Sequence, residues 1–300
     1  MLRYGLAVRP AFLTITLAGC TLGLATAWFG AVRFNGPAAI LGIVLALLAH
    51  AGINVLNDYY DHLNGTDALN KGRLFPFTGG SRFIQNHVLT PRQTLMWGLA
   101  LFGLVIAGGL WLVLRVSPAL FWYGLAGLAI GWAYSAPPLS LNSRGLGELC
   151  VAAGFVLIVA GMDLVERGKP ALLPWLAGLP YALLVTNILF INQFPDREAD
   201  AAAGKHHWVV RLAPQTAAQV YGLIALAAGG ILAAAVLVGV LPCGALIVLA
   251  GMLPSVVAAR QLRRHASEPS RLRPAIQATL AAAHLYPALL ALVLVAEHLR

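Results

Sequence analysis

Residues 38–61 read AAILGIVLALLAHAGINVLNDYYD, an apolar run of membrane-spanning length that ends directly in amides and carboxylates. A helix needs roughly 20 apolar residues to cross a hydrocarbon core, and this run has that length up to residue 57. On a helix, Asn54, Asp58 and Asp61 follow the spacing i, i+4, i+7 and therefore share one face. The stretch predicts a transmembrane helix that carries an acidic site at one end.

The composition extends this prediction to the whole chain. Of 300 residues, 59% are hydrophobic and 10% are charged, and the mean hydropathy is +0.79. A soluble domain carries about a quarter charged residues, so the bilayer is the expected solvent. Nine runs predict an all-α polytopic membrane protein with a single domain over residues 1–300: 11–31, 38–57, 93–114, 118–136, 146–165, 171–192, 215–238, 241–260 and 275–298.

The cysteines suggest no covalent framework. Cys20, Cys150 and Cys243 are far apart in apolar runs, which argues against disulfides and a structural zinc site. Residues 17–20 (LAGC) match a lipoprotein cleavage box, but the sequence stays apolar as far as Gly30. We therefore expect the first run to be an uncleaved transmembrane helix.

Lysine and arginine are distributed unevenly among the segments that join these runs. With a cytoplasmic N-terminus, fifteen of the 20 lie in cytoplasmic segments and five lie outside. This bias follows the positive-inside rule, and it accounts for the net charge of +9 without a nucleic-acid partner. The chain is expected in the inner (plasma) membrane, multi-pass, with a cytoplasmic N-terminus.

A second stretch repeats the acidic pattern of the first. Residues 192–196 (NQFPD) and residues 54–58 (NVLND) both have the form N-x-x-x-D, and Asp200 and Asp61 follow about one turn later. Both copies stand at the cytoplasmic end of an even-numbered run. Two such copies indicate a duplicated helical unit whose sites face each other.

The segments around these motifs carry two further expectations. Pro195 removes a backbone donor and is expected to bend or end its helix. The segment from about residue 58 to residue 92 is long for a compact membrane bundle and rich in glycine and proline. It is expected to be partly structured and to act as a lid.

Carboxylates gathered at a membrane interface repel one another unless a cation binds between them. Oxygen ligands with room for water and phosphate suit Mg²⁺, which rarely occupies an all-protein cage. The predicted metal ligands are Asp58, Asp61, Asp196 and Asp200. The residues predicted to bind a diphosphate are Asn54, Asn57, Asn192, Arg82, Arg144, Lys205 and Arg211.

Other polar residues are expected to have structural roles. His206 and His207 would point about 100° apart on a helix, so a solvated loop is favoured over a metal pair. The charged residues between 163 and 169 are expected to form a solvated loop on the opposite face. His50 and His284 lie within apolar runs, and hydrogen-bonded packing is favoured over a functional role for both.

Three segments of the chain carry a family resemblance: residues 57–67, which begin NDYYD; residues 196–205, which begin DREAD and end GK; and residues 134–148, which begin YSAPP and end RGLGE. The first two resemble the aspartate-rich motifs of the UbiA family of intramembrane prenyltransferases. The third resembles the segment between helices four and five of that family. The resemblance covers essentially the whole chain and implies a helical bundle with an active site on its cytoplasmic side.

Within the family, residues 54–67 and 78–82 (TGGSR) look most like the branch that acts on 1,4-dihydroxy-2-naphthoate in menaquinone synthesis. The resemblance implies Mg²⁺-dependent transfer of a polyprenyl group from its diphosphate to this acceptor or a similar aromatic quinone precursor. It also implies that Tyr134 faces the allylic cation, that Asp67 is the base and that Arg144 stabilises the leaving diphosphate. The chain departs from the family pattern after Pro138, where an additional basic residue is missing, and at residues 206–207.

Alternatives remain open at this stage. A UbiA-type enzyme with another acceptor, or a UbiA-type terpene cyclase, would keep the diphosphate site. A secondary transporter also shows repeats and acidic residues, although transporter sites usually lie near the bilayer midplane. No obligate protein partner is expected, and the expected partners are a polyprenyl diphosphate, an aromatic acceptor and membrane lipid.

Overall fold

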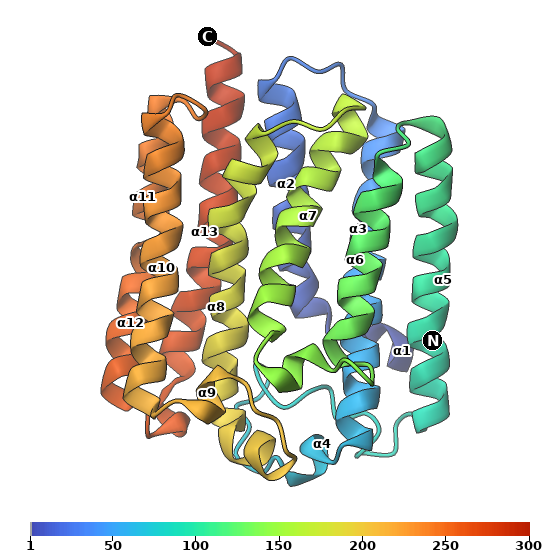
Figure 1. The fold of residues 1–300 in the computed structure, drawn as a ribbon, viewed down its shortest axis with the longest axis vertical. Coiled ribbons are helices and arrows are strands. Elements are labelled where there is room, and N and C mark those ends of the chain that lie inside the picture. The colour runs from blue at the N-terminus through green and yellow to red at the C-terminus, as the bar shows by residue number, and fades with distance from the viewer. Residues whose placement is uncertain (1) are drawn as a thin grey trace.

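A computed structural model describes residues 2–300 as a bundle of helices that run side by side, with no β-strand in that range (Figure 1). The long helices are α2 (Pro10–Phe29), α3 (Gly36–Leu63), α5 (Pro91–Arg115), α6 (Leu120–Ser135), α7 (Gly147–Arg167), α8 (Leu173–Ala202), α10 (Pro214–Leu237), α12 (Leu253–His265) and α13 (Arg273–His298). The short helices are α1 (Leu2–Ala7), α4 (Thr66–Leu69), α9 (Trp208–Arg211) and α11 (Val248–Gly251), with 3₁₀ turns η1 (Leu141–Arg144), η2 (Cys243–Ile247) and η3 (Pro269–Arg271).

The long helices confirm the predicted membrane bundle. Within the described residues, 8 helical stretches are long and apolar enough to cross a membrane, the continuous stretch Cys243–His265 being one of them. The remaining predicted span is α6, which has 16 residues and packs against α3 and α7. The prediction of nine spans is therefore approximate, and the prediction of an all-α multi-pass membrane protein is confirmed.

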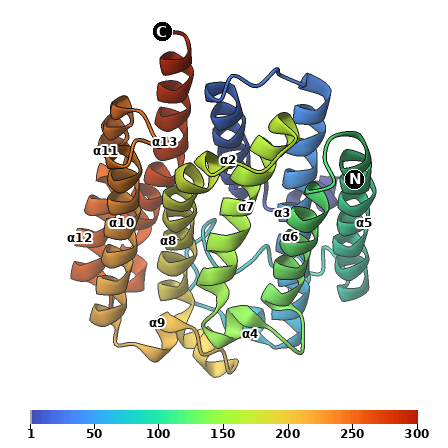
Figure 2. The same cartoon turned by 45° about the horizontal axis from the view of Figure 1, so that its top comes forward.

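Helices α2, α7 and α8 form the middle of the bundle. Helices α3, α5 and α6 lie on one side of them, and α10, α12 and α13 lie on the other (Figures 1 and 2). Buried tyrosines join neighbouring helices: the Tyr181 hydroxyl of α8 donates to the Ile15 carbonyl of α2, and the Tyr286 hydroxyl of α13 donates to the Ala177 carbonyl of α8 at 3.0 Å. Each hydroxyl has an acceptor, so these large rings are buried without an unpaired polar group.

Two helices extend beyond their predicted ends. α3 has 28 residues and is about 42 Å long at 1.5 Å per residue, more than the roughly 30 Å of a hydrocarbon core. α8 continues to Ala202 and contains Pro180 and Pro195. The prediction that Pro195 could end the helix is wrong, because a proline removes only its own backbone donor and the following turn still forms. The last turns of both helices carry the acidic motifs.

Short elements gather at the end of the bundle where α3 and α8 finish. α4, α9 and the segment that links α4 to α5 all lie there (Figure 1). The segment is partly structured, as predicted, and it ends at Thr90, which forms a capping box with Gln93 at the start of α5. The C-terminus lies at the opposite end.

Two acidic residues that were predicted to lie in a solvated loop at the opposite end of α7 lie on the helix instead, whereas Lys169 lies in an exposed connection after it, as predicted. α7 continues to Arg167, so Asp163 and Glu166 lie on the helix and are buried. Arg167 binds the Asp163 carboxylate through two nitrogens at 2.7 and 2.8 Å, and the Thr26 hydroxyl donates to the same carboxylate at 3.0 Å. The prediction failed for these two acids because α7 continues two residues beyond the apolar run 146–165, and Asp163 has partners within the protein, Arg167 and Thr26. These contacts join α7 to α2.

Candidate active site

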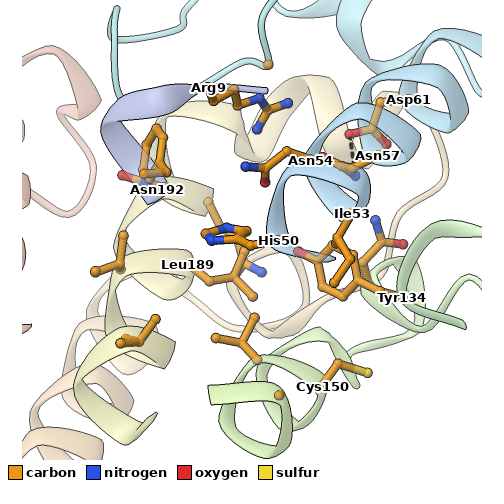
Figure 3. A pocket seen from close by; sticks show the side chains of 18 of the residues that line it. Arg9, His50, Ile53, Asn54, Asn57, Asp61, Tyr134, Cys150, Leu189 and Asn192 are labelled. Atoms are coloured by element: carbon orange, nitrogen blue, oxygen red, sulfur yellow. Dashed lines mark hydrogen bonds between the residues drawn. The ribbon is translucent and has the colours of Figure 1, made fainter. Parts of the chain in front are cut away.

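A cavity of about 330 Å³ extends from the ends of α3 and α8 into the bundle. Its outer part is lined by carboxylates, amides and cations, and its inner part is lined by apolar side chains and glycines (Figure 3). The inner lining includes Phe12, Ile130, Gly154, Ile158 and Ile188. A cavity divided in this way fits an amphipathic molecule with an anionic head and a hydrocarbon tail.

One face of α3 forms the polar wall of the cavity. His50, Asn54, Asn57 and Asp61 all line it and follow the helical spacing 4, 3, 4. The Asn57 amide donates to the Asp61 carboxylate at 3.2 Å and to the Ser135 hydroxyl at 3.1 Å. The Asn54 amide donates to the carbonyl of Val8 at 3.1 Å. These contacts hold α3 against α6 and against the segment before α2.

Lys205 joins the two acidic motifs. Its Nζ lies 2.9 Å from Asp61 Oδ1 and 3.2 Å from Asp200 Oδ1, and the residue is buried. Burial by itself favours the neutral amine, but Asp61 and Asp200 outweigh it and hold the pKa of Lys205 above its ordinary value. The structure thus brings the two N-x-x-x-D motifs face to face around one buried cation.

Asp196 ties the segment after α4 to α8. The Asn70 amide donates to Asp196 Oδ1 at 2.6 Å, and the Gly79 backbone N–H donates to Oδ2 at 3.2 Å. Asn70, Thr78, Gly79 and Gly80 also line the cavity. The segment therefore covers part of the outer cavity and is held there by the second motif.

Asp58 is paired with Arg9, which comes from the segment between α1 and α2. Arg9 donates to Asp58 Oδ1, and the Ser81 backbone N–H approaches the same carboxylate at 3.3 and 3.4 Å. Arg9 has φ 55°, a left-handed conformation. Sequence reasoning counted Arg9 only as a topology charge. The sequence could have indicated a role for Arg9, because it directly precedes the first long helix, α2, on the same side of the membrane as both acidic motifs.

Asp67 lies on α4 and is 3% exposed. The Gln85 amide donates to its Oδ2 at 3.3 Å. Burial, followed by the negative charges of Asp61 and Asp58, raises the pKa of Asp67 to about 7. Asp67 is thus a buried carboxyl group whose pKa is raised chiefly by burial and further by the neighbouring aspartates.

His207 is buried and belongs to the cavity wall, so the prediction that it lies in a solvated loop is wrong. Its Nε2 lies 3.0 Å from Asp200 Oδ2, while the neighbouring His206 is exposed. The prediction treated the two histidines alike, but the chain turns after Gly204 and directs one ring inward and the other outward. Asn70, His207 and Arg9 are the residues of the site that sequence reasoning missed.

Three predicted cations do not line the cavity. Arg82 donates to the Asn70 carbonyl at 2.9 Å, and Arg144 is exposed and donates to the Pro138 carbonyl at 2.6 Å. Arg211 donates to the Arg144 carbonyl at 3.0 Å. Tyr134, by contrast, lines the cavity beside Ile53 (Figure 3). Lys205 and Arg9 are thus the cations closest to the carboxylates.

The oxygen-rich donor set suits a hard divalent cation. Asn70 Oδ1, Asn192 Oδ1 and Gln193 Oε1 are buried oxygens of cavity-lining residues that lack a hydrogen-bond partner within residues 2–300. Together with the aspartates they supply the ligand type that Mg²⁺ prefers. No three acidic, histidine or cysteine side chains in the described range already form a metal-binding group. Three of the aspartates are paired with cations instead: Asp58 with Arg9, and both Asp61 and Asp200 with Lys205.

The chain matches the UbiA prenyltransferase family over residues 12–296. It belongs to that family. UbiA relatives include a 1,4-dihydroxy-2-naphthoate octaprenyltransferase of Bacillus subtilis, 29% identical over 66% of this chain and 61% of the relative's length. The enzyme of the same name from Mycobacterium leprae is 27% identical over 85% of this chain and 82% of its own length.

Solved UbiA structures share the fold. The structure of a UbiA homologue from Archaeoglobus fulgidus bound to GPP and Mg²⁺ has a TM-score of 0.63, with 14% sequence identity over 98% of this chain and 99% of that chain. At this identity the likeness establishes the helical arrangement alone. Family membership establishes that the protein is a prenyltransferase enzyme embedded in a membrane.

Proposed function

We propose that this UbiA protein transfers a polyprenyl group from its diphosphate to a hydroxylated aromatic acid, namely 1,4-dihydroxy-2-naphthoate or a similar quinone precursor, in an Mg²⁺-dependent reaction. The cavity carries the proposal, because carboxylates and cations line one end and apolar side chains line the other. The naphthoate prenyltransferases among its relatives support the choice of acceptor. A terpene cyclase would share this cavity, and only its product would differ.

Each part of the cavity has a role in this proposal. Asp58, Asp61, Asp196 and Asp200 would hold Mg²⁺, which when bound neutralises charge on the diphosphate. Lys205 and Arg9 are proposed to bind the diphosphate oxygens through charge-assisted hydrogen bonds. Arg82, Arg144 and Arg211 are proposed to attract the diphosphate from positions around the cavity, and Asn54, Asn57 and Asn192 to hydrogen-bond it.

The chain's own residues also shape the chemistry at the prenyl carbon. The allylic C–O bond breaks, and the diphosphate leaves with the bonding electron pair. The Tyr134 ring faces the resulting allylic cation and, with the apolar wall, excludes water. A ring carbon of the acceptor forms the new C–C bond, and Asp67 receives the proton that this carbon loses. The raised pKa of Asp67 suits a carboxylate that accepts a proton.

The proposal places the active site on the cytoplasmic side of the inner membrane. Both acidic motifs, α4 and α9 lie at one end of the bundle (Figure 1). The positive-inside bias assigns this end to the cytoplasm. Labelling of Lys71→Cys and Lys169→Cys in intact cells tests the assignment, with Cys243→Ser in both variants because the native thiol is exposed. Only the cysteine at 169 should react with an impermeant reagent.

Product analysis tests the function itself. The purified protein in lipid nanodiscs receives Mg²⁺, a polyprenyl diphosphate and a panel of hydroxylated aromatic acids. We expect diphosphate release coupled to a prenylated aromatic product. Diphosphate release with a cyclic hydrocarbon and no aromatic product would show a terpene cyclase. The absence of diphosphate release with every acceptor would exclude the proposed reaction.

A further inference from the structure

His50 presents a polar atom to the apolar part of the cavity. It lies on α3 two helical turns, or about 12 Å of rise, from Asp58 towards the membrane interior. Its Nδ1 lies 2.7 Å from the hydroxyl of Thr16, a fully buried residue of α2. Its ring meets the Phe155 ring edge-on, with centroids 5.7 Å apart. Thr16 and Phe155 therefore fix the orientation of the imidazole.

The second ring nitrogen of His50 is free. Within residues 2–300, Nε2 has no hydrogen-bond partner, and it is not among the buried unpaired atoms. The residue lines the cavity, and Figure 3 shows its ring next to Leu189. Nε2 is therefore accessible from the cavity and can form a hydrogen bond with a molecule bound there.

His284 provides an internal comparison. It also lies in a membrane helix and also binds a threonine of α2: its Nε2 lies 3.0 Å from the Thr14 hydroxyl. Its other nitrogen, Nδ1, lies 2.8 Å from the Leu280 carbonyl. His284 therefore has both nitrogens satisfied by protein and lies outside the cavity lining, as expected for a packing role. His50 has one nitrogen satisfied.

We propose that His50 binds a hydroxyl group of the aromatic acceptor through Nε2, and that Thr16 positions its ring. The proposal rests on the function proposed above. A hydroxyl suits this atom in either tautomer, because it donates to an unprotonated Nε2 and accepts from a protonated one. A prenyl chain placed there would leave Nε2 without a partner.

The depth of His50 fits this role. The diphosphate occupies the outer cavity beside Asp61 and Lys205, so the prenyl carbon that reacts lies just inside them. A ring that attacks this carbon lies beside Asn54 and directs its far hydroxyl inward along α3. Ala46 and Ala49, which also line the cavity, are small enough to leave space for a fused ring near His50.

Steady-state kinetics with paired acceptors test the proposal. The probes are 1,4-dihydroxy-2-naphthoate and its two monomethyl ethers, each with the same polyprenyl diphosphate. In the wild type, kcat/KM should fall by about 10- to 100-fold for the ether that blocks the hydroxyl facing His50, the range for one buried hydrogen bond. In His50→Leu the free and blocked acceptors should be used equally, while the KM for the prenyl diphosphate stays within about twofold.

Matched variants separate binding from folding. Thr16→Val should raise the acceptor KM several-fold with little change in kcat, because the imidazole remains but is no longer held. His50→Gln should recover part of the preference, since its amide both donates and accepts. His284→Leu should keep the wild-type preference for the free hydroxyl. Thermal unfolding of each variant reports folding separately.

Two results would overturn the proposal. In the first, His50→Leu keeps the wild-type discrimination between acceptor and ethers. In the second, it raises only the KM for the prenyl diphosphate, which would place the prenyl chain beside His50. Failure of the proposed function looks different: the wild type would then release diphosphate without any prenylated aromatic product, and the assignment of His50 would fall with it.

Discussion

The position of Lys205 depends on two helices that are far apart in the sequence. It contacts Asp61 from the end of α3 and Asp200 from the end of α8, and it is buried between them. Removing one partner of a buried ion pair leaves the other charge unpaired in a poorly solvated place. In the proposed reaction, Lys205 would also bind the diphosphate.

Lys205→Met tests this residue. We expect kcat to fall by on the order of 10²-fold or more, the scale for losing one charged group that stabilises a leaving anion. Lys71→Met is the matched control, because Lys71 is exposed on the segment after α4. The measurement is steady-state kinetics with the prenyl diphosphate varied. A wild-type kcat in Lys205→Met would show that Lys205 only neutralises the aspartates.

The sequence and the structure lead to opposite predictions about which of Arg9 and Arg144 matters more for activity. Arg144 is the only cation of its motif, yet it is exposed, whereas Arg9 contacts Asp58 inside the site. We expect Arg9→Ala to lower kcat by about 10²-fold, the scale for losing one such donor, and Arg144→Ala to lower it less. Both variants are assayed at saturating prenyl diphosphate. The reverse order of effects would mean that Arg144 turns into the cavity when substrate binds.

At the scale of elements, the segment between α4 and α5 completes the site. Gly80 has φ +67°, and a Cβ there would lie 2.9 Å from Asp58 Oδ1 and 3.1 Å from Asp67 Oδ1. Gly65 has φ +83° with nothing within 4 Å of a Cβ. The two glycines have similar backbone conformations, but only one of them adjoins the carboxylates.

Gly80→Ala and Gly65→Ala therefore form a matched pair. Each should cost about 1–2 kcal/mol for placing an L residue in the left-handed region. Only Gly80→Ala should also displace the carboxylates, so its activity should fall at least tenfold below that of Gly65→Ala. Thermal unfolding and specific activity are measured side by side. Equal activities would show that the backbone near Gly80 shifts to accommodate the methyl group without displacing the carboxylates.

At the scale of the whole molecule, the candidate active site and a buried ion pair lie at opposite ends of the bundle. The acidic motifs lie at one end, and the pair between Asp163 and Arg167 lies at the opposite end of α7, with side chains 1% and 13% exposed. Asp163→Ala should destabilise the protein by about 3–5 kcal/mol, the range for breaking a buried pair. The substrate KM values should stay unchanged.

Glu268→Ala is the control for that variant. Glu268 pairs with Arg271 at the surface, where both side chains are at least half exposed, so its loss should cost under about 1 kcal/mol. Thermal unfolding of the two variants in the same detergent gives the comparison. Equal stability losses would show that the Asp163 pair is not effectively buried in the membrane.

Removal of divalent metal should affect the site as a whole, because the proposed metal ligands come from different helices. The carboxylates from α3, α4 and α8 converge, and the pKa of Asp67 is raised by the charges of Asp61 and Asp58 in addition to burial. A diphosphate would add further negative charge, so turnover should stop after exhaustive chelation and return with Mg²⁺ or Mn²⁺. The measurement is diphosphate release with and without chelator. Full activity in chelator would exclude the metal-dependent reaction.

The sequence by itself determined the membrane bundle, the pairing of two acidic motifs and the family. Hydrophobic run length and the spacing of Asn54, Asp58 and Asp61 are local properties, so they could be predicted from neighbouring residues. The prediction for His50 and His284 was the same for both residues, because both lie in similar apolar runs. The residues next to each histidine in the sequence do not indicate which of the two lines the cavity.

Only the tertiary structure decided which polar side chains enter the cavity. Arg9 and His207 point into it and Arg144 does not, although each comes from a connecting segment at the same end of the bundle. The direction of such a side chain depends on contacts with helices distant in the sequence, such as that of Arg9 with Asp58. The orientations of His50 and His284 likewise depend on distant residues, because each ring contacts a threonine of α2, Thr16 for His50 and Thr14 for His284.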